Sequence, residues 1–125
     1  MGWWAYFWVA IGSALGGVAR YWLTGFVAML LGPQFPWGTI LINVIGSFVI
    51  GFFGTLTAHR FPVPFELRAF VMVGLCGGFT TFSAFSLQTL ELMQAGEMVP
   101  ALGYATGSVV LCVAATLCGW ALGRL

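Results

Sequence analysis

Charged side chains are almost absent from this 125-residue sequence. Four residues are Lys or Arg and three are Asp or Glu, so charged residues make up 6% of the chain, whereas a soluble domain has about 25%. So few charges could not cover a surface that faces water, but a surface that faces lipid needs none. The sequence therefore excludes a soluble domain and predicts an integral membrane protein with lipid as its surroundings and no nucleic-acid partner.

Residues that support catalysis or bind metals are also scarce. The single histidine, His59, is predicted at a membrane edge, and the three acidic residues are glutamates near predicted helix ends. The three cysteines lie inside apolar runs, where cysteine packs as a small residue, so we expect no disulfide. This inventory argues against an enzyme, against a His or Cys metal cluster, and against proton-coupled transport, which needs an ionisable residue inside the bilayer.

Long apolar runs take the place of charge. Hydrophobic residues make up 61% of the chain, and they form four runs separated by short segments with turn residues. Each run is long enough to cross a bilayer, since about 20 apolar residues suffice. The runs extend approximately over Trp3–Leu31, Trp37–Ala58, Phe65–Met93 and Val99–Gly123. We therefore predict an all-α membrane protein that forms one domain of four transmembrane helices over residues 1–125.

Glycines and hydroxyl residues interrupt the third run, in the segment GGFTTFSAFS at residues 77–86. Each glycine costs about 1 kcal/mol relative to alanine in a helix, and Gly77 and Gly78 stand just before two threonines. The sequence therefore predicts a broken helix near residues 76–80. Carbonyl groups left unpaired in such a break cannot face lipid, so they must be buried in protein or bind something such as a cation.

Two stripes of side chains follow the predicted break. Phe79, Phe82 and Phe85 recur every three residues and each precedes a hydroxyl residue, which places rings and O–H donors about 100° apart on a helix. Ring edges attract an anion without a formal charge. Asn43, in the second run, adds amide donors in mid-membrane. Hydrogen bonds between helices would explain single polar groups, but together these groups favour a path for a small anion, with fluoride as one candidate.

One charge lies inside the first run: Arg20, in the stretch GGVARYW. Its long side chain could extend to the membrane interface. Alternatively, it could face a wet vestibule or cap carbonyl groups of a neighbouring helix. The sequence leaves both interpretations open.

Glycines at i,i+4 spacing let helices approach closely in lipid. Examples of such pairs are Gly12 with Gly16, Gly103 with Gly107, and Gly119 with Gly123. Four closely packed short helices leave little room for a pore in one chain, so we expect any conduction path to lie against a second copy.

The sequence resembles the Fluc (CrcB) family of fluoride channels over essentially its whole length. The motifs are GGVARYW, GTILINVIGSF and GLCGGFTTFSAFS. The resemblance implies a passive, highly selective channel that exports fluoride from the bacterial cytoplasm across the inner (plasma) membrane. It also implies an antiparallel, dual-topology homodimer of four-helix subunits, with two pores along the interface and a structural sodium ion at the centre.

The resemblance also implies which residues form the site. The implied fluoride pathway consists of Asn43, Phe82, Phe85, Ser83, Tyr104 and Ser108. Arg20 is implied at the vestibule, and a polar track consists of Thr81, Ser86 and Gln88. The backbone carbonyl groups of Gly77 and Thr80 are implied as sodium ligands. The chain departs from the family pattern twice, with Ala84 in place of a usual threonine and Gln88 in place of a common glutamate.

Two other functions and one alternative assembly stay open. A small multidrug-type exporter also has four short helices, but it needs a carboxylate in the membrane. A non-transporting membrane scaffold would explain the glycines but not the Phe and hydroxyl stripes. Arg60, Arg68 and Arg124 are predicted on one side of the membrane and only Arg20 toward the other, which permits dual insertion but also permits a paired partner of opposite bias.

Overall fold

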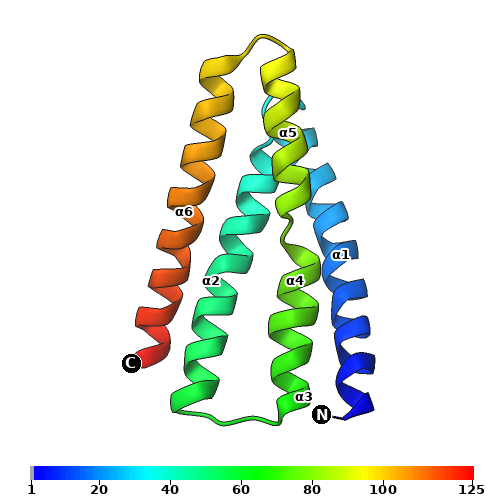
Figure 1. Ribbon diagram of the computed structural model, residues 1–125, viewed down its shortest axis with the longest axis vertical. Coiled ribbons are helices and arrows are strands. Elements are labelled where there is room, and N and C mark those ends of the chain that lie inside the picture. Colours follow the sequence, from blue (N-terminus) through cyan, green and yellow to red (C-terminus); the bar gives the residue numbers. More distant parts are fainter. Residues whose placement is uncertain (1) are drawn as a thin grey trace.

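The computed structural model describes residues 2–125, and the regular structure in this range is helical throughout. Four helical stretches are long and apolar enough to cross a membrane: Trp3–Leu31, Trp37–His59, Phe65–Gln94 and Met98–Arg124. They run up and down side by side, and both termini lie at the same end (Figure 1). The prediction of an all-α protein with four membrane-spanning helices is confirmed, and the chain is a multi-pass membrane protein.

The first, second and fourth spans are single helices, and the third is divided. The elements are α1 (Trp3–Leu31), α2 (Trp37–His59), α3 (Phe65–Arg68), η1 (Ala69–Leu75), α4 (Cys76–Phe79), α5 (Phe82–Gln94) and α6 (Met98–Arg124). Gly32 ends α1 with φ 84°, and Gly96 joins α5 to α6 with φ 81°, a backbone region that glycine enters without strain. The two ends of each of the four spans lie within one residue of their predicted positions.

The third span bends where Thr80 and Thr81 leave the helical conformation. Thr80 has φ −86° and ψ 158°, and Thr81 has φ −150° and ψ 118°, so both are extended. Before the bend, η1 is a π-helix, a wider turn that often occurs near functional sites. The extended residues stand at the end of the predicted range 76–80 and one position beyond it, since the glycines stay helical up to Phe79.

The glycines before the bend serve close packing against α1. A Cβ at Gly78 would lie 2.6 Å from the carbonyl oxygen of Ser13, and one at Gly74 would lie 2.9 Å from the Cα of Gly12. Both distances are shorter than van der Waals contact, so α1 meets η1 and α4 backbone to backbone. Gly12 and Gly16 on α1 therefore pack closely, as their spacing predicts.

The pairs on α6 behave differently from each other. A Cβ at Gly119 would lie 2.7 Å from the backbone N of Phe52, and Gly123 also meets the α2 backbone, so this pair packs closely as predicted. Gly103 and Gly107 meet nothing within 4 Å in this chain. Close packing within the chain therefore does not explain Gly103 and Gly107, because a Cβ at either position would meet no other atom of residues 2–125 within 4 Å.

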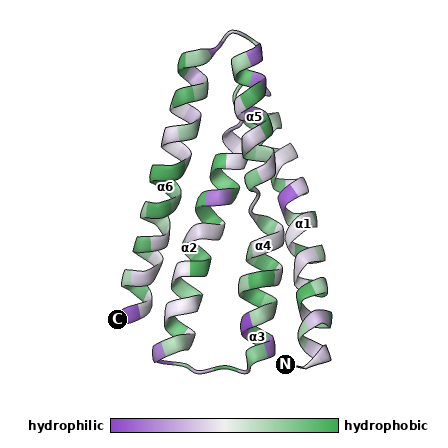
Figure 2. Ribbon diagram, viewed as in Figure 1, coloured by the Kyte–Doolittle hydropathy of each residue, from purple (hydrophilic) through white to green (hydrophobic). Residues whose placement is uncertain are grey.

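Most large apolar side chains point outward, as expected of a surface in lipid. Figure 2 shows hydrophobic residues along the whole length of the helices, with hydrophilic segments near the two ends of the bundle and at few positions between. Tyr104 and Ile42 are the largest side chains that are fully buried. Few side chains are therefore fully buried, and polar residues in the middle of the spans are the best indication of a functional site.

Candidate functional site

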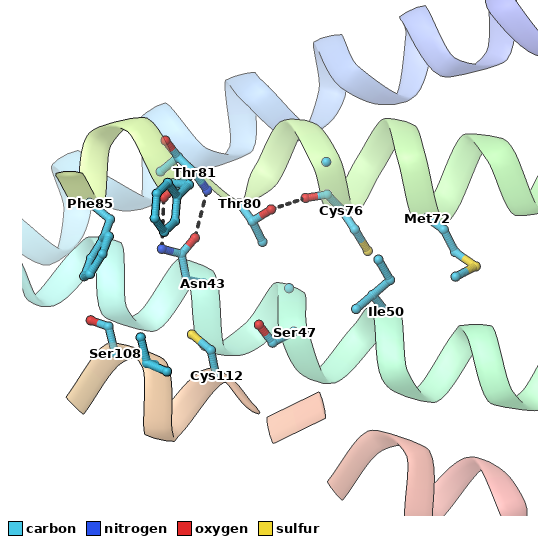
Figure 3. A pocket seen from close by; sticks show the side chains of 14 residues that line it. Asn43, Ser47, Ile50, Met72, Cys76, Thr80, Thr81, Phe85, Ser108 and Cys112 are labelled. Carbon is cyan, nitrogen blue, oxygen red and sulfur yellow. Dashed lines mark hydrogen bonds between the residues drawn. The ribbon is translucent and has the colours of Figure 1, made fainter. Parts of the chain in front are cut away.

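A cavity of about 300 Å³ lies between α2, the bent third span and α6, at the level of the bend. Its polar lining consists of Asn43, Ser47, Thr80, Thr81 and Ser108, and its aromatic lining consists of Phe82 and Phe85 (Figure 3). The lining contains no acidic or basic side chain. The cavity therefore offers hydroxyl and amide groups and ring edges at mid-membrane, without a formal charge.

Asn43 holds the backbone of the bend. Its Nδ2 donates to the carbonyl oxygen of Thr81 at 3.1 Å, and the N–H of Thr81 donates to its Oδ1 at 2.8 Å (Figure 3). The N–H of Thr81 has no helical acceptor at the bend, so its bond to Asn43 satisfies a donor that would otherwise be unpaired. An amide nitrogen carries two N–H groups, so one N–H of Asn43 is left to donate elsewhere.

Two carbonyl groups lose their helical partners at the bend. In a continuous helix the N–H of Thr81 would donate to Gly77, but here it donates to Asn43. Likewise the N–H of Ala84 would donate to Thr80, but it donates to Oγ1 of Thr81 at 3.1 Å and so starts α5. The carbonyl groups of Gly77 and Thr80 therefore lack these bonds, and unwound backbone of this kind supplies cation ligands in membrane proteins.

Side-chain metal ligands do not provide an alternative cation site. Among residues 2–125, no group of three or more His, Cys, Asp or Glu is placed to hold a metal ion. The chemistry of the free carbonyl groups fits a hard cation such as sodium, which takes oxygen ligands.

The aromatic side chains form a row from the cavity to the contact between α5 and α6. The rings of Phe82 and Phe85 lie 5.4 Å apart at an angle of 45°, and those of Phe85 and Tyr104 lie 5.1 Å apart at 44°. Phe82 is 76% exposed, whereas Tyr104 is fully buried. Phe82 therefore projects from the open side of this chain, and Phe85 stands between it and the core.

Ser108 is the polar group whose surroundings are incomplete. Its hydroxyl is buried in the cavity wall and has no hydrogen-bond partner among the described residues. One turn earlier on α6, the hydroxyl of Tyr104 donates to Oε1 of Gln88 at 2.7 Å. An unsatisfied buried hydroxyl costs about 1–3 kcal/mol, so Ser108 is a candidate donor to an ion or water in the cavity.

Arg20 fastens α1 to the last turn of α4. Its Nε donates to the carbonyl oxygen of Gly78 at 3.2 Å. Of the interpretations that the sequence leaves open, this contact agrees with capping of a neighbouring helix. Arg20 is not among the residues that line the cavity, so the geometry in one chain does not bring it to the other predicted site residues.

The remaining predicted residues lie on α5, outside this cavity. Ser83 is exposed, with its Oγ 3.3 Å from Oγ1 of Thr81, and Ser86 is exposed too. Gln88 lines a second cavity of about 330 Å³ near the α5–α6 loop, together with Glu91 and Glu97. Tyr104 on α6 connects the linings of the two cavities, because it is bonded to Gln88 and its ring packs at a tilt against Phe85.

Seven lining residues were not predicted from the sequence, and three of these have a hydroxyl or thiol group. Ser47, Cys76 and Cys112 each line the cavity. Each stands four residues from a site residue, which is one helical turn, so the i,i+4 rule could have found them. Their small size and weak polarity hid them among packing residues.

Comparison with known proteins gives a consistent result. A sequence model of the family described as "CrcB-like protein, Camphor Resistance (CrcB)" matches residues 7–120. A Methylocella silvestris protein named fluoride-specific ion channel FluC is 63% identical over 116 residues, covering 91% of this chain and 88% of the relative. Proteins of the same name from Methylobacterium radiotolerans and Opitutus terrae are 57% and 53% identical, covering 89% and 91% of this chain and 78% and 88% of the relatives. These relatives are named as channels, in agreement with the prediction that the chain is not an enzyme.

Proposed function

Because the chain belongs to the CrcB family, we propose that it is a passive and highly selective fluoride channel. The family membership confirms the resemblance inferred from three sequence motifs. The observation that supports the activity best is the buried hydroxyl of Ser108, which has no hydrogen-bond partner in the described part of the chain and lies in the wall of a cavity with amide, hydroxyl and aromatic groups. A strongly hydrated anion needs several donors at close range to replace its water, and this wall supplies them.

The groups that line the cavity favour an anion over a cation. Asn43 has one N–H to donate, Ser108 has a free O–H, and the Phe ring edges have partial positive charge. The lining includes no carboxylate that would repel an anion. We assign Asn43, Phe82, Phe85, Ser83, Tyr104 and Ser108 to the fluoride path, Thr81, Ser86 and Gln88 to a polar track, and Arg20 to the vestibule through its contact at the bend.

We further propose that a second copy of the chain covers the open side of the cavity. Phe82 is 76% exposed beside polar backbone, and Gly103 and Gly107 present a face of α6 with no neighbour in this chain. An antiparallel, dual-topology homodimer would bring two bends together and enclose two pores. The carbonyl groups of Gly77 and Thr80 would then hold a structural sodium ion between the subunits.

In a cell, the proposed channel would reside in the bacterial inner membrane and export fluoride. Fluoride enters as neutral HF and is trapped as the anion at the higher pH of the cytoplasm, so a passive path suffices for its release. Neither alternative suits the cavity as well. A multidrug-type exporter needs a carboxylate where this lining has none, and a scaffold has no use for the free Ser108 hydroxyl.

Fluoride efflux from liposomes tests the proposal. Purified protein is reconstituted with potassium fluoride inside, valinomycin is added to carry potassium, and a fluoride electrode records release, with chloride-loaded vesicles as the comparison. Rapid fluoride release without chloride release is the expected result. Release of neither ion by folded, dimeric protein would contradict the proposal for this chain alone, and reconstitution with a second CrcB chain would then test a paired assembly.

A further inference from the structure

The cavity at the bend continues toward the end of the bundle that contains both termini. A third hollow, of about 420 Å³, lies beside it, between α2, the start of the third span and α6. Ile50 and Met72 line both hollows, so the two adjoin along one groove. Arg68 lines the outer hollow, near the membrane edge, and is the one charged residue among the lining of the two.

Three rows of residues, each with one-turn spacing, form this groove. The third span contributes Arg68, Met72, Cys76 and Thr80; α6 contributes Ser108, Cys112, Thr116 and Trp120; and α2 contributes Asn43, Ser47, Ile50 and Gly54. Residues three or four positions apart share one face of a helix, so each row is continuous. The groove thus joins Arg68 to the Asn43 and Ser108 end without crossing a helix.

The contacts of Arg68 fix its guanidinium without neutralising it. Its Nη1 donates to the carbonyl oxygen of Gly54 at 3.1 Å and to the hydroxyl of Thr57, both on α2. Both acceptors are uncharged, and the other N–H groups of Arg68 have no hydrogen-bond partner among residues 2–125. The half-buried side chain therefore keeps a full positive charge and free donors beside the groove.

Arg20, assigned above to the vestibule, does not border this groove. It lines neither hollow, and its Nε is bonded to Gly78 on the side of α4 that faces α1. A cationic side chain at the opening of a pore raises the local concentration of anions, as rings of Arg or Lys do in anion pores.

We propose that Arg68 is the anion-recruiting residue at the outer end of the groove, where it binds a small inorganic anion before that anion reaches Asn43 and Ser108. This inference rests on the proposed fluoride channel. It assigns to Arg68 a positioning role that depends on charge and acts on ion entry, while the groups at the bend act on selectivity.

The test is fluoride efflux measured over a range of fluoride concentrations for wild type, Arg68→Gln and Arg68→Lys. We expect Arg68→Gln to lower flux at low fluoride by about tenfold, with a much smaller loss at saturating fluoride and unchanged rejection of chloride. Arg68→Lys keeps the charge and should stay within about twofold of wild type. Arg60→Gln is the matched control, because Arg60 is exposed at the same end and lines neither hollow.

The dependence of fluoride flux on ionic strength provides a second test, because a purely structural role of Arg68 would not produce it. Raising it with impermeant ions from about 0.01 M to about 0.15 M shortens the Debye length from about 30 Å to about 8 Å. Wild-type flux at low fluoride should then fall toward that of Arg68→Gln. If Arg68→Gln fails to fold, this salt dependence and Arg68→Lys decide instead.

Three results would overturn the inference while leaving the channel intact: Arg68→Gln with wild-type flux at low fluoride, Arg68→Lys with a large loss at all concentrations, or wild-type flux that ignores ionic strength. A wild-type protein that releases no fluoride would overturn the channel and this inference together.

Discussion

The two faces of the third span contrast sharply. Toward α1, Gly74 and Gly78 place backbone against backbone, so close that a Cβ would overlap neighbouring atoms. Toward α2 and α6, Met72, Cys76 and Thr80 line an open groove. One helix thus has a closed face for packing and an open face for polar chemistry. In a chain of four short helices, this division would keep the proposed path for ions separate from the contacts that hold the fold together.

The largest expected effect comes from adding a side chain on the packed face. Gly16 meets the backbone of α4, with a Cβ position 2.8 Å from the N of Phe79, whereas its neighbour Gly17 has nothing within 4 Å. Gly16→Ala should therefore separate α1 from α4 and lower stability by about 1–3 kcal/mol, while Gly17→Ala should not. Thermal unfolding in detergent, with size-exclusion profiles, measures the difference. Equal stability of the two variants would show that this face is not tightly packed.

The next effect concerns the open face and its aromatic residues. Phe85→Ile keeps the bulk at the cavity wall but removes the ring edge, so fluoride flux should fall by at least about tenfold while the protein stays folded. Phe82→Ile tests the exposed ring of the pair in the same way. Efflux from liposomes measures both, and unchanged flux in both variants would remove ring edges from the mechanism.

A comparison within α6 then separates chemistry from packing. Ser108 has a buried hydroxyl without a partner among residues 2–125, whereas the hydroxyl of Thr116 shares its one hydrogen between the carbonyl oxygens of Ser47 and Cys112, each 3.1 Å from Oγ1. Ser108→Ala should lower flux severalfold and leave stability unchanged or higher. Thr116→Val should lower stability by about 1 kcal/mol and affect flux less. The same effects in both variants would mean that Ser108 is an ordinary packing residue.

Sequence reasoning succeeded where a pattern repeats and was incomplete where a contact joins distant parts of the chain. Apolar run length placed all four spans within one residue of their observed ends. The role of Gly78 was misread, because its intrinsic helix preference says nothing about Ser13, which approaches it from 65 positions earlier in the sequence. The bonds between Asn43 and Thr81 were equally hidden, since only the fold brings an amide of α2 to the backbone of the bend.

The smallest expected effect concerns Gln88, in the second cavity near the α5–α6 loop. Its Oε1 accepts the hydroxyl hydrogen of Tyr104 at 2.7 Å, and a glutamate could accept the same bond. Gln88→Glu should therefore preserve the fold and change fluoride flux by about twofold or less, with the direction set by the added charge beside Glu91 and Glu97 in the second cavity. Gln88→Leu removes the acceptor, leaves the Tyr104 hydroxyl unpaired and should lower flux more. Liposome efflux compares the three proteins directly. A larger loss in Gln88→Glu than in Gln88→Leu would show that charge, and not the bond to Tyr104, controls this end of the path.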